Sequence, residues 1–229
     1  MNEPEAHWRK KEFFELAVFL LLIIPSMMIS FLPMGKERLG FAVMAVSIIL
    51  RDISLTCLVF FFLWRDGEPL SRLGWKFGRL KEEIALGAIL ILPVLYAEPL
   101  LVKVFQWFGL SSAMSRLPQF LTPKGLPEIF LACILAAVAA VAEETIFRGY
   151  LLLRLNDLTG STIAAVLISS VLFSLGHGYE GAASVGTVGV LGLLLALTYV
   201  WRKSLVAPAV LHFLIDFFPL VLLPLFKLK

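Results

Sequence analysis

Cysteine and histidine are scarce in this chain, and no stretch of it is strongly basic. The two cysteines, Cys57 and Cys133, both lie in apolar runs, and no C-x-x-C pair or histidine-rich tract accompanies them. We therefore expect buried small side chains rather than a disulfide, a nucleophile or a structural metal site. The formal net charge is +3, but no run of lysine and arginine is long enough for a nucleic-acid surface. We accordingly expect no nucleic-acid partner.

The apolar runs lack the alternation of transmembrane β-strands, and no internal repeat of the kind found in inverted-repeat transporters is visible. The 229 residues are 59% hydrophobic and their mean hydropathy is +0.90, whereas a soluble domain is about half apolar. Several runs are long enough to cross about 30 Å of hydrocarbon. The sequence therefore predicts an all-α, polytopic transmembrane helical bundle of about seven or eight spans, without a separate soluble domain.

Seven apolar runs follow one another along the chain. They cover about residues 13–33, a stretch that ends near 64, 84–108, 126–155, 161–177, a stretch that ends at 201, and one that begins between 204 and 208. The first is too long for the apolar region of a signal peptide, and no A-x-A cleavage site follows it. The tail forms either an eighth span or the end of the seventh. We divide the chain into N-terminal helices with a cytoplasmic loop, 1–125, and a catalytic core, 126–229.

The charged loops predict the orientation in the membrane. Arg65 and Lys81 bound the most charged loop, and Arg202 and Lys203 follow a later span. A cytoplasmic N-terminus puts both loops in the cytoplasm, in line with the positive-inside tendency. The opposite side then receives Lys36, Arg38, Arg116 and Lys124. Residues 70–80 mix apolar and basic side chains, and we expect them to lie along the lipid headgroups.

Charged residues inside the apolar runs are the first candidates for function, because a charge at mid-bilayer costs roughly 3 kcal/mol or more. Arg51 and Asp52 interrupt the second run; a structural ion pair, a membrane-edge site and a functional role all remain open. Glu144 and Arg148 are spaced to pair on one helix face. Glu143 points to another face, which is rich in alanine and open to a neighbouring helix. We expect Glu144 to be neutralised and Glu143 to face a polar cavity.

Two of the three histidines lie within or at the ends of later apolar runs. His177 follows Phe173 by four residues, and His212 precedes Asp216 by four, so each pair shares a helix face. Taken alone, each histidine is equally well interpreted as a satisfied structural residue. His7 precedes the first span, and we assign it no role.

Depth in the membrane connects these groups. At 1.5 Å per residue, Glu143 and His177 lie roughly 20 to 25 Å from the turn at 156–160, on antiparallel helices. His212 and Asp216 lie roughly 13 to 20 Å from the same membrane edge. Three helices are therefore expected to bring four chemically capable side chains to a similar depth.

Hydrolysis of an amide needs an activated water, a proton acceptor and stabilisation of the oxyanion. A glutamate in a cavity of low dielectric constant is a suitable base, and two histidines can donate to the developing charge. No G-x-S-x-G elbow occurs, and neither cysteine has a nucleophile's motif around it. The residues therefore favour a water-based hydrolase over a serine or cysteine enzyme.

Three ordered motifs, Glu143-Glu144-x-x-x-Arg148, Phe173-x-x-x-His177 and His212-x-x-x-Asp216, resemble those of the CPBP family. That family comprises CAAX prenyl proteases of the Ras-converting type and bacterial relatives linked to bacteriocin processing or immunity. The resemblance covers about residues 126–218, and the ordered set is far more specific than any one motif. It implies an intramembrane endopeptidase.

By this resemblance Glu143 would be the general base and His177 its partner, while His212 and Asp216 would stabilise the oxyanion. Glu144, Arg148 and Phe173 would have supporting roles. The sequence departs from the prenyl-protease branch at Asp216, where asparagine is commonest. An ionised aspartate cannot donate a hydrogen bond to an oxyanion. Three roles of Asp216 are therefore left open: it orients His212, it is protonated, or it binds a metal.

The resemblance leaves metal dependence open. Glu143, His177 and His212 form the two-histidine, one-glutamate set that some catalytic zinc sites use, with Asp216 as a fourth ligand or an outer partner. No H-E-x-x-H helix is present to hold two ligands at one-turn spacing. We expect a glutamate-type enzyme without a cofactor, with zinc as the alternative.

Two other functions stay open: a non-catalytic immunity or scaffold protein of the same fold, and an ion-coupled transporter that uses Glu143, His177 and Asp216 as a relay. The expected partners are the lipid bilayer and a membrane-associated peptide or protein, prenylated in the eukaryotic branch of the family. Short loops and small size favour a prokaryotic cell membrane, where the substrate is an unlipidated peptide or a sorting tail.

Overall fold

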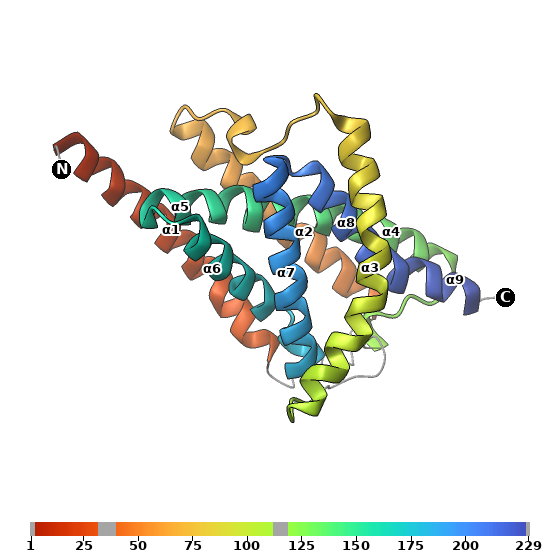
Figure 1. The fold of residues 1–229 in the computed structure, drawn as a ribbon. Coiled ribbons are helices and arrows are strands. Elements are labelled where there is room, and N and C mark those ends of the chain that lie inside the picture. The colour runs from red at the N-terminus through yellow and green to blue at the C-terminus, as the bar shows by residue number, and fades with distance from the viewer. Residues whose placement is uncertain (1–2, 32–39, 112–118, 228–229) are drawn as a thin grey trace.

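The computed structural model describes residues 3–31, 40–111 and 119–227 of the chain. It is 86% helical and has no strand among those residues (Figure 1). The all-α polytopic prediction is confirmed. Of the loop residues expected opposite the cytoplasm, Lys36, Arg38 and Arg116 lie outside the described ranges, whereas Lys124 lies two residues before the fourth predicted span.

The helices follow the predicted apolar runs. They are α1 (Glu3–Ser30), α2 (Phe41–Arg65), α3 (Leu80–Trp107), α4 (Leu126–Glu144), α5 (Leu152–Thr159), α6 (Thr162–Leu175), α7 (Ala182–Arg202), α8 (Val206–Phe217) and α9 (Leu223–Lys227). A π-helical segment, Thr145–Leu151, joins α4 to α5, and another, Phe218–Leu222, joins α8 to α9.

Six helical stretches in the described ranges are long and apolar enough to cross a membrane, counting α4 to α5 and α8 to α9 each as one stretch. The fifth predicted span is α6, whose 14 residues extend only about 21 Å along the helix axis. The tail continues the last long stretch, Val206–Phe226, and does not form a separate eighth span among the described residues.

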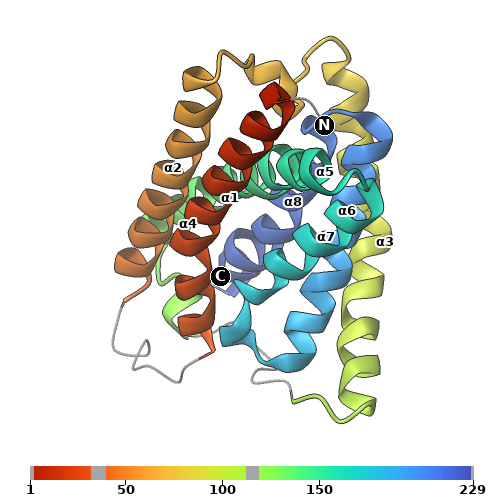
Figure 2. The same ribbon diagram turned by 90° about the vertical axis from the view of Figure 1, so that its left-hand side faces the viewer.

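Helix α8 lies inside the bundle. It packs against α3 on one side and α4 on the other, while α2 packs against the outer side of α4. Helix α6 packs between α5 and α7, and α1 lies over α5 and α6 (Figure 2). Since α4 and α8 carry the acidic and histidine motifs, this arrangement places both motifs at the centre of the molecule.

The loop between α2 and α3 is anchored in the bundle. Leu73 ends a short 3-10 helix and is fully buried. It packs against Gly149, where an added Cβ would lie 3.2 Å from the Cβ of Leu73. The indole Nε1 of Trp75 donates to Thr145 Oγ1 at 3.0 Å. The expectation of a segment that lies only along the headgroups is therefore wrong for these two residues, which insert into the protein.

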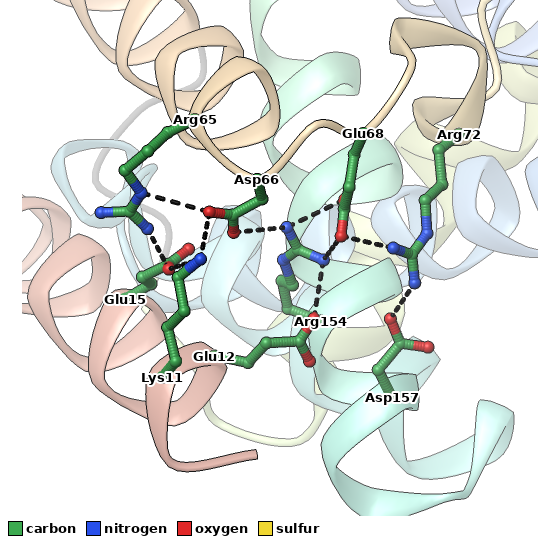
Figure 3. Close-up of polar contacts among 9 residues, drawn as sticks. All are labelled: Lys11, Glu12, Glu15, Arg65, Asp66, Glu68, Arg72, Arg154 and Asp157. Carbon is green, nitrogen blue, oxygen red and sulfur yellow. Dashed lines mark hydrogen bonds and ion pairs between the residues drawn. The ribbon is translucent and has the colours of Figure 1, made fainter. Parts of the chain in front are cut away.

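An ionic cluster joins the two halves of the chain at one end of the molecule (Figure 3). Its centre is Arg154 of α5, whose side chain is fully buried. Arg154 Nη1 lies 2.9 Å from Glu12 Oε1 on α1 and 3.0 Å from Glu68 Oε1 in the loop after α2. Around it, Arg65 pairs with Glu15, and Arg72 Nη2 lies 2.8 Å from Asp157 Oδ2. The remaining members shown are Lys11 and Asp66, which pair with each other.

Candidate active site

A cavity of about 510 Å³ lies among the helices. Its walls come from α1, α2, α3, α4, α6, α7 and α8, together with the turns that follow them. Glu143, His177, His212 and Asp216 all line it. The four side chains therefore converge, as the sequence predicts. The physical reason is that the rise per residue and the antiparallel packing of the helices together fix their depth.

The two adjacent glutamates of α4 have different environments. Glu144 is fully buried, and its Oε1 accepts a hydrogen bond from Arg148 Nη1 at 2.7 Å. Arg148 Nη2 also donates to the carbonyl oxygen of Gly192 on α7, at 3.1 Å. Glu143 instead faces the cavity with 14% of its side chain exposed. The predicted Glu144–Arg148 pair is confirmed, and Glu143 is the acid that faces the open volume.

Glu144 has a second contact that the sequence does not predict. The Nδ1 atom of His212 lies 2.8 Å from Glu144 Oε1. Because a carboxylate only accepts, the proton in this contact is on Nδ1. The other ring nitrogen, Nε2, lies 3.8 Å from Glu143 Oε2 and 3.7 Å from Asp216 Oδ2. Glu144, not Asp216, therefore makes the hydrogen bond that orients the imidazole of His212.

Phe173 is a packing centre for the motif residues. The guanidinium of Arg148 lies 4.1 Å from the centroid of its ring, within the range of a cation–π interaction. The rings of His177 and His212 lie 5.2 and 5.6 Å from the same centroid. Gly192 permits this packing, since an added Cβ there would lie 3.0 Å from Phe173 Cδ1. One aromatic side chain thus supports both histidines and the buried arginine.

His177 lies just beyond the end of α6, rather than within the predicted helical run. Its Nδ1 lies 3.2 Å from the carbonyl oxygen of Phe173, which accepts the ring proton. The last turn of α1 fixes this region, because Ser30 Oγ accepts from the amide of Gly178 and donates to the carbonyl of Leu175, each at 3.1 Å. Nothing local in the sequence indicates this contact of Ser30.

Tyr179 lies two residues beyond His177 and also lines the cavity. Burial raises the pKa of the Tyr179 phenol well above its usual value, and the nearby carboxylates of Glu180 and Asp216 raise it further. The phenol therefore stays protonated at neutral pH and retains a donor. Its ring lies 6.2 Å from that of His177. Sequence reasoning did not select Tyr179, since a single tyrosine in a turn has no motif around it.

Helices α4 and α8 both change to π-helical geometry within two residues of their acidic motif residues. Thr145–Leu151 follows Glu144, and Phe218–Leu222 follows Asp216 and Phe217. Single π-helical turns are rare and occur often at functional sites. The predicted regular helix over 126–155 is therefore interrupted, and Arg148 and Gly149 project differently from residues of an unbroken α-helix.

Arg51 and Asp52 of α2 extend the site beyond the three motifs. Arg51 Nη2 lies 2.7 Å from Asp52 Oδ1 and 3.4 Å from Glu143 Oε1. Both residues line the cavity. The pair is therefore not a purely local ion pair, because Arg51 contacts the glutamate that faces the cavity.

The alternative zinc set does not come together as a ligand cluster. Within the described ranges, no three histidine, cysteine, aspartate or glutamate side chains are grouped to hold a metal ion. His177 and His212 each have Nδ1 occupied by an oxygen contact, to Phe173 and Glu144 respectively. The guanidinium of Arg51 already supplies a positive charge beside Glu143. These contacts place Glu143, His177 and His212 in a network of hydrogen bonds and ion pairs.

A family model described as Type II CAAX prenyl endopeptidase Rce1-like matches residues 125–218. Those residues form a domain of the CPBP family. No curated protein and no solved structure matches the chain significantly. The chain that carries this CPBP domain is an integral, multi-pass membrane protein and, in general terms, an intramembrane endopeptidase of the CAAX type.

Within the CPBP domain, replacing Glu144 with glutamine should lower stability more than it alters chemistry. The substitution leaves Arg148 buried without its carboxylate, and removing one partner of a buried pair costs about 3–5 kcal/mol. The amide oxygen of glutamine still accepts from His212 Nδ1. We expect a low yield and a lowered thermal midpoint, with the folded fraction still active. Full stability with no activity would mean that the roles of the two glutamates are reversed.

Proposed function

We propose that this chain is a glutamate-type intramembrane endopeptidase in which Glu143 activates water. The observation that carries the proposal is the division between the adjacent acids. Arg148 neutralises Glu144, whereas Glu143 faces a cavity shared with His177 and His212. A base needs access to water and substrate, and only Glu143 of the two has it.

In the proposed reaction a water molecule between Glu143 and His177 attacks the peptide carbonyl carbon. The carboxylate of Glu143 takes the proton, and the carbonyl oxygen becomes an oxyanion. His212, protonated on both nitrogens, donates from Nε2 to that oxygen while Nδ1 stays on Glu144. When the C–N bond breaks, the proton on Glu143 passes to the leaving amine. The carbonyl carbon keeps the oxygen of water as a carboxylic acid.

His212 carries the positive charge in this mechanism because Glu144 contacts it directly and Glu143 and Asp216 lie within 4 Å. This arrangement gives Asp216 a role that does not require it to donate. An ionised Asp216 near Nε2 favours the imidazolium form of His212 through its charge. The departure from asparagine at this position is then compatible with catalysis.

We infer that the substrate is a membrane-associated peptide or protein. The CAAX protease family in general implies a prenylated one. The cavity has the size of a small-molecule or peptide site. With the N-terminus in the cytoplasm, a substrate terminus enters from the cytoplasmic side.

Labelling of cysteines placed at Asn156, Lys203 and Gly125 checks this orientation. Cysteines at Asn156 and Lys203 should react from the cytoplasmic side, and the one at Gly125 is the comparison from the opposite side. Reaction of the first two only from outside would show that the topology is inverted.

The test of the proposed function is cleavage of membrane-anchored peptides in proteoliposomes without an ion gradient. Matched prenylated and unprenylated peptides should separate the two substrate classes, and the Glu143→Gln variant is the negative control. Cleavage that depends on Glu143 supports the endopeptidase. Gradient-driven ion flux without cleavage would instead support a transporter, and absence of both would support a non-catalytic scaffold.

Chelation of metal ions should leave the activity of the purified enzyme unchanged. The proposal needs no divalent cation, because Glu143, His177 and His212 supply the base and the donors, and the Arg51 charge opposes a second cation beside Glu143. Elemental analysis of active enzyme should be paired with an assay after chelation. Stoichiometric zinc, with activity lost on removal and restored by zinc, would overturn the metal-independent mechanism.

A further inference from the structure

Arg51 is the only lysine or arginine among the described residues that line the cavity. Five carboxylates line the same cavity: Asp52, Glu98, Glu143, Glu180 and Asp216. Of these, Arg51 contacts Asp52 and Glu143. The single guanidinium of the cavity therefore lies beside Glu143, the carboxylate that we propose as the base. It belongs to α2, outside the matched residues 125–218.

Asp52 holds the guanidinium in place. Its Oδ1 accepts from Arg51 Nε at 2.8 Å and lies 2.7 Å from Nη2. The Asp52 side chain is 1% exposed, whereas that of Arg51 is 45% exposed. A long side chain with that freedom adopts many rotamers unless a fixed partner restricts it. The buried carboxylate supplies such a partner, and the second contact of Nη2 is with Glu143.

We propose that Arg51, held by Asp52, is a positioning residue for Glu143. Its guanidinium, 3.4 Å from Glu143 Oε1, holds the carboxylate of Glu143 turned toward the substrate. The inference rests on the proposed function of Glu143 and extends it to the N-terminal half of the chain. A purely structural Arg51–Asp52 pair would be complete without the contact to Glu143.

Recognition of a substrate's terminal carboxylate is a weaker assignment for Arg51. In a CaaX peptide the scissile bond is three residues from the C-terminus, so the terminal carboxylate lies up to about 10 Å from that bond in an extended chain. Arg51 Nη2 lies 3.4 Å from Glu143 Oε1. The guanidinium is therefore beside the reacting bond rather than beside the peptide's end.

The charges around Glu143 show what Arg51 supplies. Asp52 faces Glu143 from α2, Glu144 and Arg148 lie on α4 and on the π-helical segment after it, and His212 and Asp216 face it from α8. His177 lines the cavity from the turn after α6. Arg148 makes its hydrogen bond with Glu144, whereas Arg51 and His212 are the cations with a nitrogen within 4 Å of a Glu143 oxygen among the described residues. Without Arg51, Glu143 loses one of its two nearest cations, while the repulsion from Asp52 and Asp216 remains.

The kinetic test compares Arg51→Gln with Arg51→Lys in proteoliposomes. We expect Arg51→Gln to lower kcat by about 10- to 100-fold, as a displaced catalytic group does, with KM within about twofold of wild type. Arg51→Lys keeps the charge and should restore most of the loss. The matched control is Arg65→Gln. It removes another arginine of α2, one that pairs with Glu15 rather than with a cavity residue, and it should keep full kcat. Wild-type kcat in Arg51→Gln, an equal loss in the lysine variant, or a loss confined to KM would overturn the proposal.

A double-mutant cycle on thermal stability tests the contact independently of activity. Arg51→Gln and Glu143→Gln, alone and together, should give thermal midpoints that depart from additivity by roughly 2 °C or more. Asp52→Asn is nearly isosteric and should reduce that coupling if Asp52 acts through Arg51. Additive midpoints would overturn the pairing even where cleavage is normal. If wild-type protein cleaves nothing, the proposed function fails, whereas the cycle still decides whether Arg51 and Glu143 interact.

Discussion

Glu143→Gln is expected to abolish peptide cleavage while the protein remains folded. The amide is nearly isosteric with the carboxylate but cannot accept the proton of the attacking water. General-base catalysis contributes about 10²- to 10⁴-fold. We therefore expect kcat to fall by about a thousandfold or more, because the variant also loses the hydrogen bond that orients the attacking water. The measurement is single-turnover cleavage of a membrane-anchored peptide, together with the thermal midpoint of the same preparation.

The control for this experiment is Glu128→Gln on the same helix. Glu128 lies in the first turn of α4, where its Oε2 accepts from the backbone amide of Lys124. The Glu128→Gln substitution neutralises the same type of side chain, but at the other end of α4 from Glu143. This variant should therefore keep wild-type cleavage. Wild-type turnover by Glu143→Gln would remove Glu143 from the mechanism.

Arg154→Met is expected to produce the largest loss of stability. The methionine keeps much of the apolar stem but removes the guanidinium from Glu12 and Glu68. Breaking a buried ion pair from one side costs about 3–5 kcal/mol, which corresponds to a fall in the thermal midpoint on the order of 10 °C for a chain of this size. Thermal unfolding in detergent measures it.

A paired variant tests the physical reason for that loss. In Glu12→Gln/Arg154→Met the buried carboxylate of Glu12 is also neutralised, so part of the lost stability should return. Arg79 lies at an exposed position directly before α3. Arg79→Gln is therefore the control for the loss of an arginine outside the ionic cluster. An Arg154→Met protein as stable as wild type would show that the cluster contributes nothing to folding.

Local spacing predicts some contacts of the site well. Glu144 and Arg148 are four residues apart, and helical geometry alone brings them together. Depth along antiparallel helices places His177 and His212 near Glu143, because the rise per residue is nearly constant. These predictions depend only on helix geometry and on the order of the spans.

Contacts that depend on lateral packing are not accessible in the same way. His212 reaches Glu144 across 68 positions, and Arg51 reaches Glu143 across 92. Each contact needs the relative rotation of two helices, which hydrophobic periodicity does not fix when a span is apolar on every side. The π-helical segment after Glu144 adds a local rotation. For that reason the acid that orients His212 was not identified from the spacing of His212 and Asp216.

The ionic cluster around Arg154 also bears on the order in which the chain assembles during synthesis. Glu12 and Glu68 are made long before Arg154, yet each contacts its guanidinium in the folded protein. Until α5 emerges, the carboxylates of Glu12 and Glu68 lack this guanidinium. When Arg154 arrives, its charge favours docking of α1 and the loop after α2 onto the newly made helix. Expressed alone, the segment 125–218 would lack both carboxylates, so Arg154 would lose its partners from α1 and from the loop after α2.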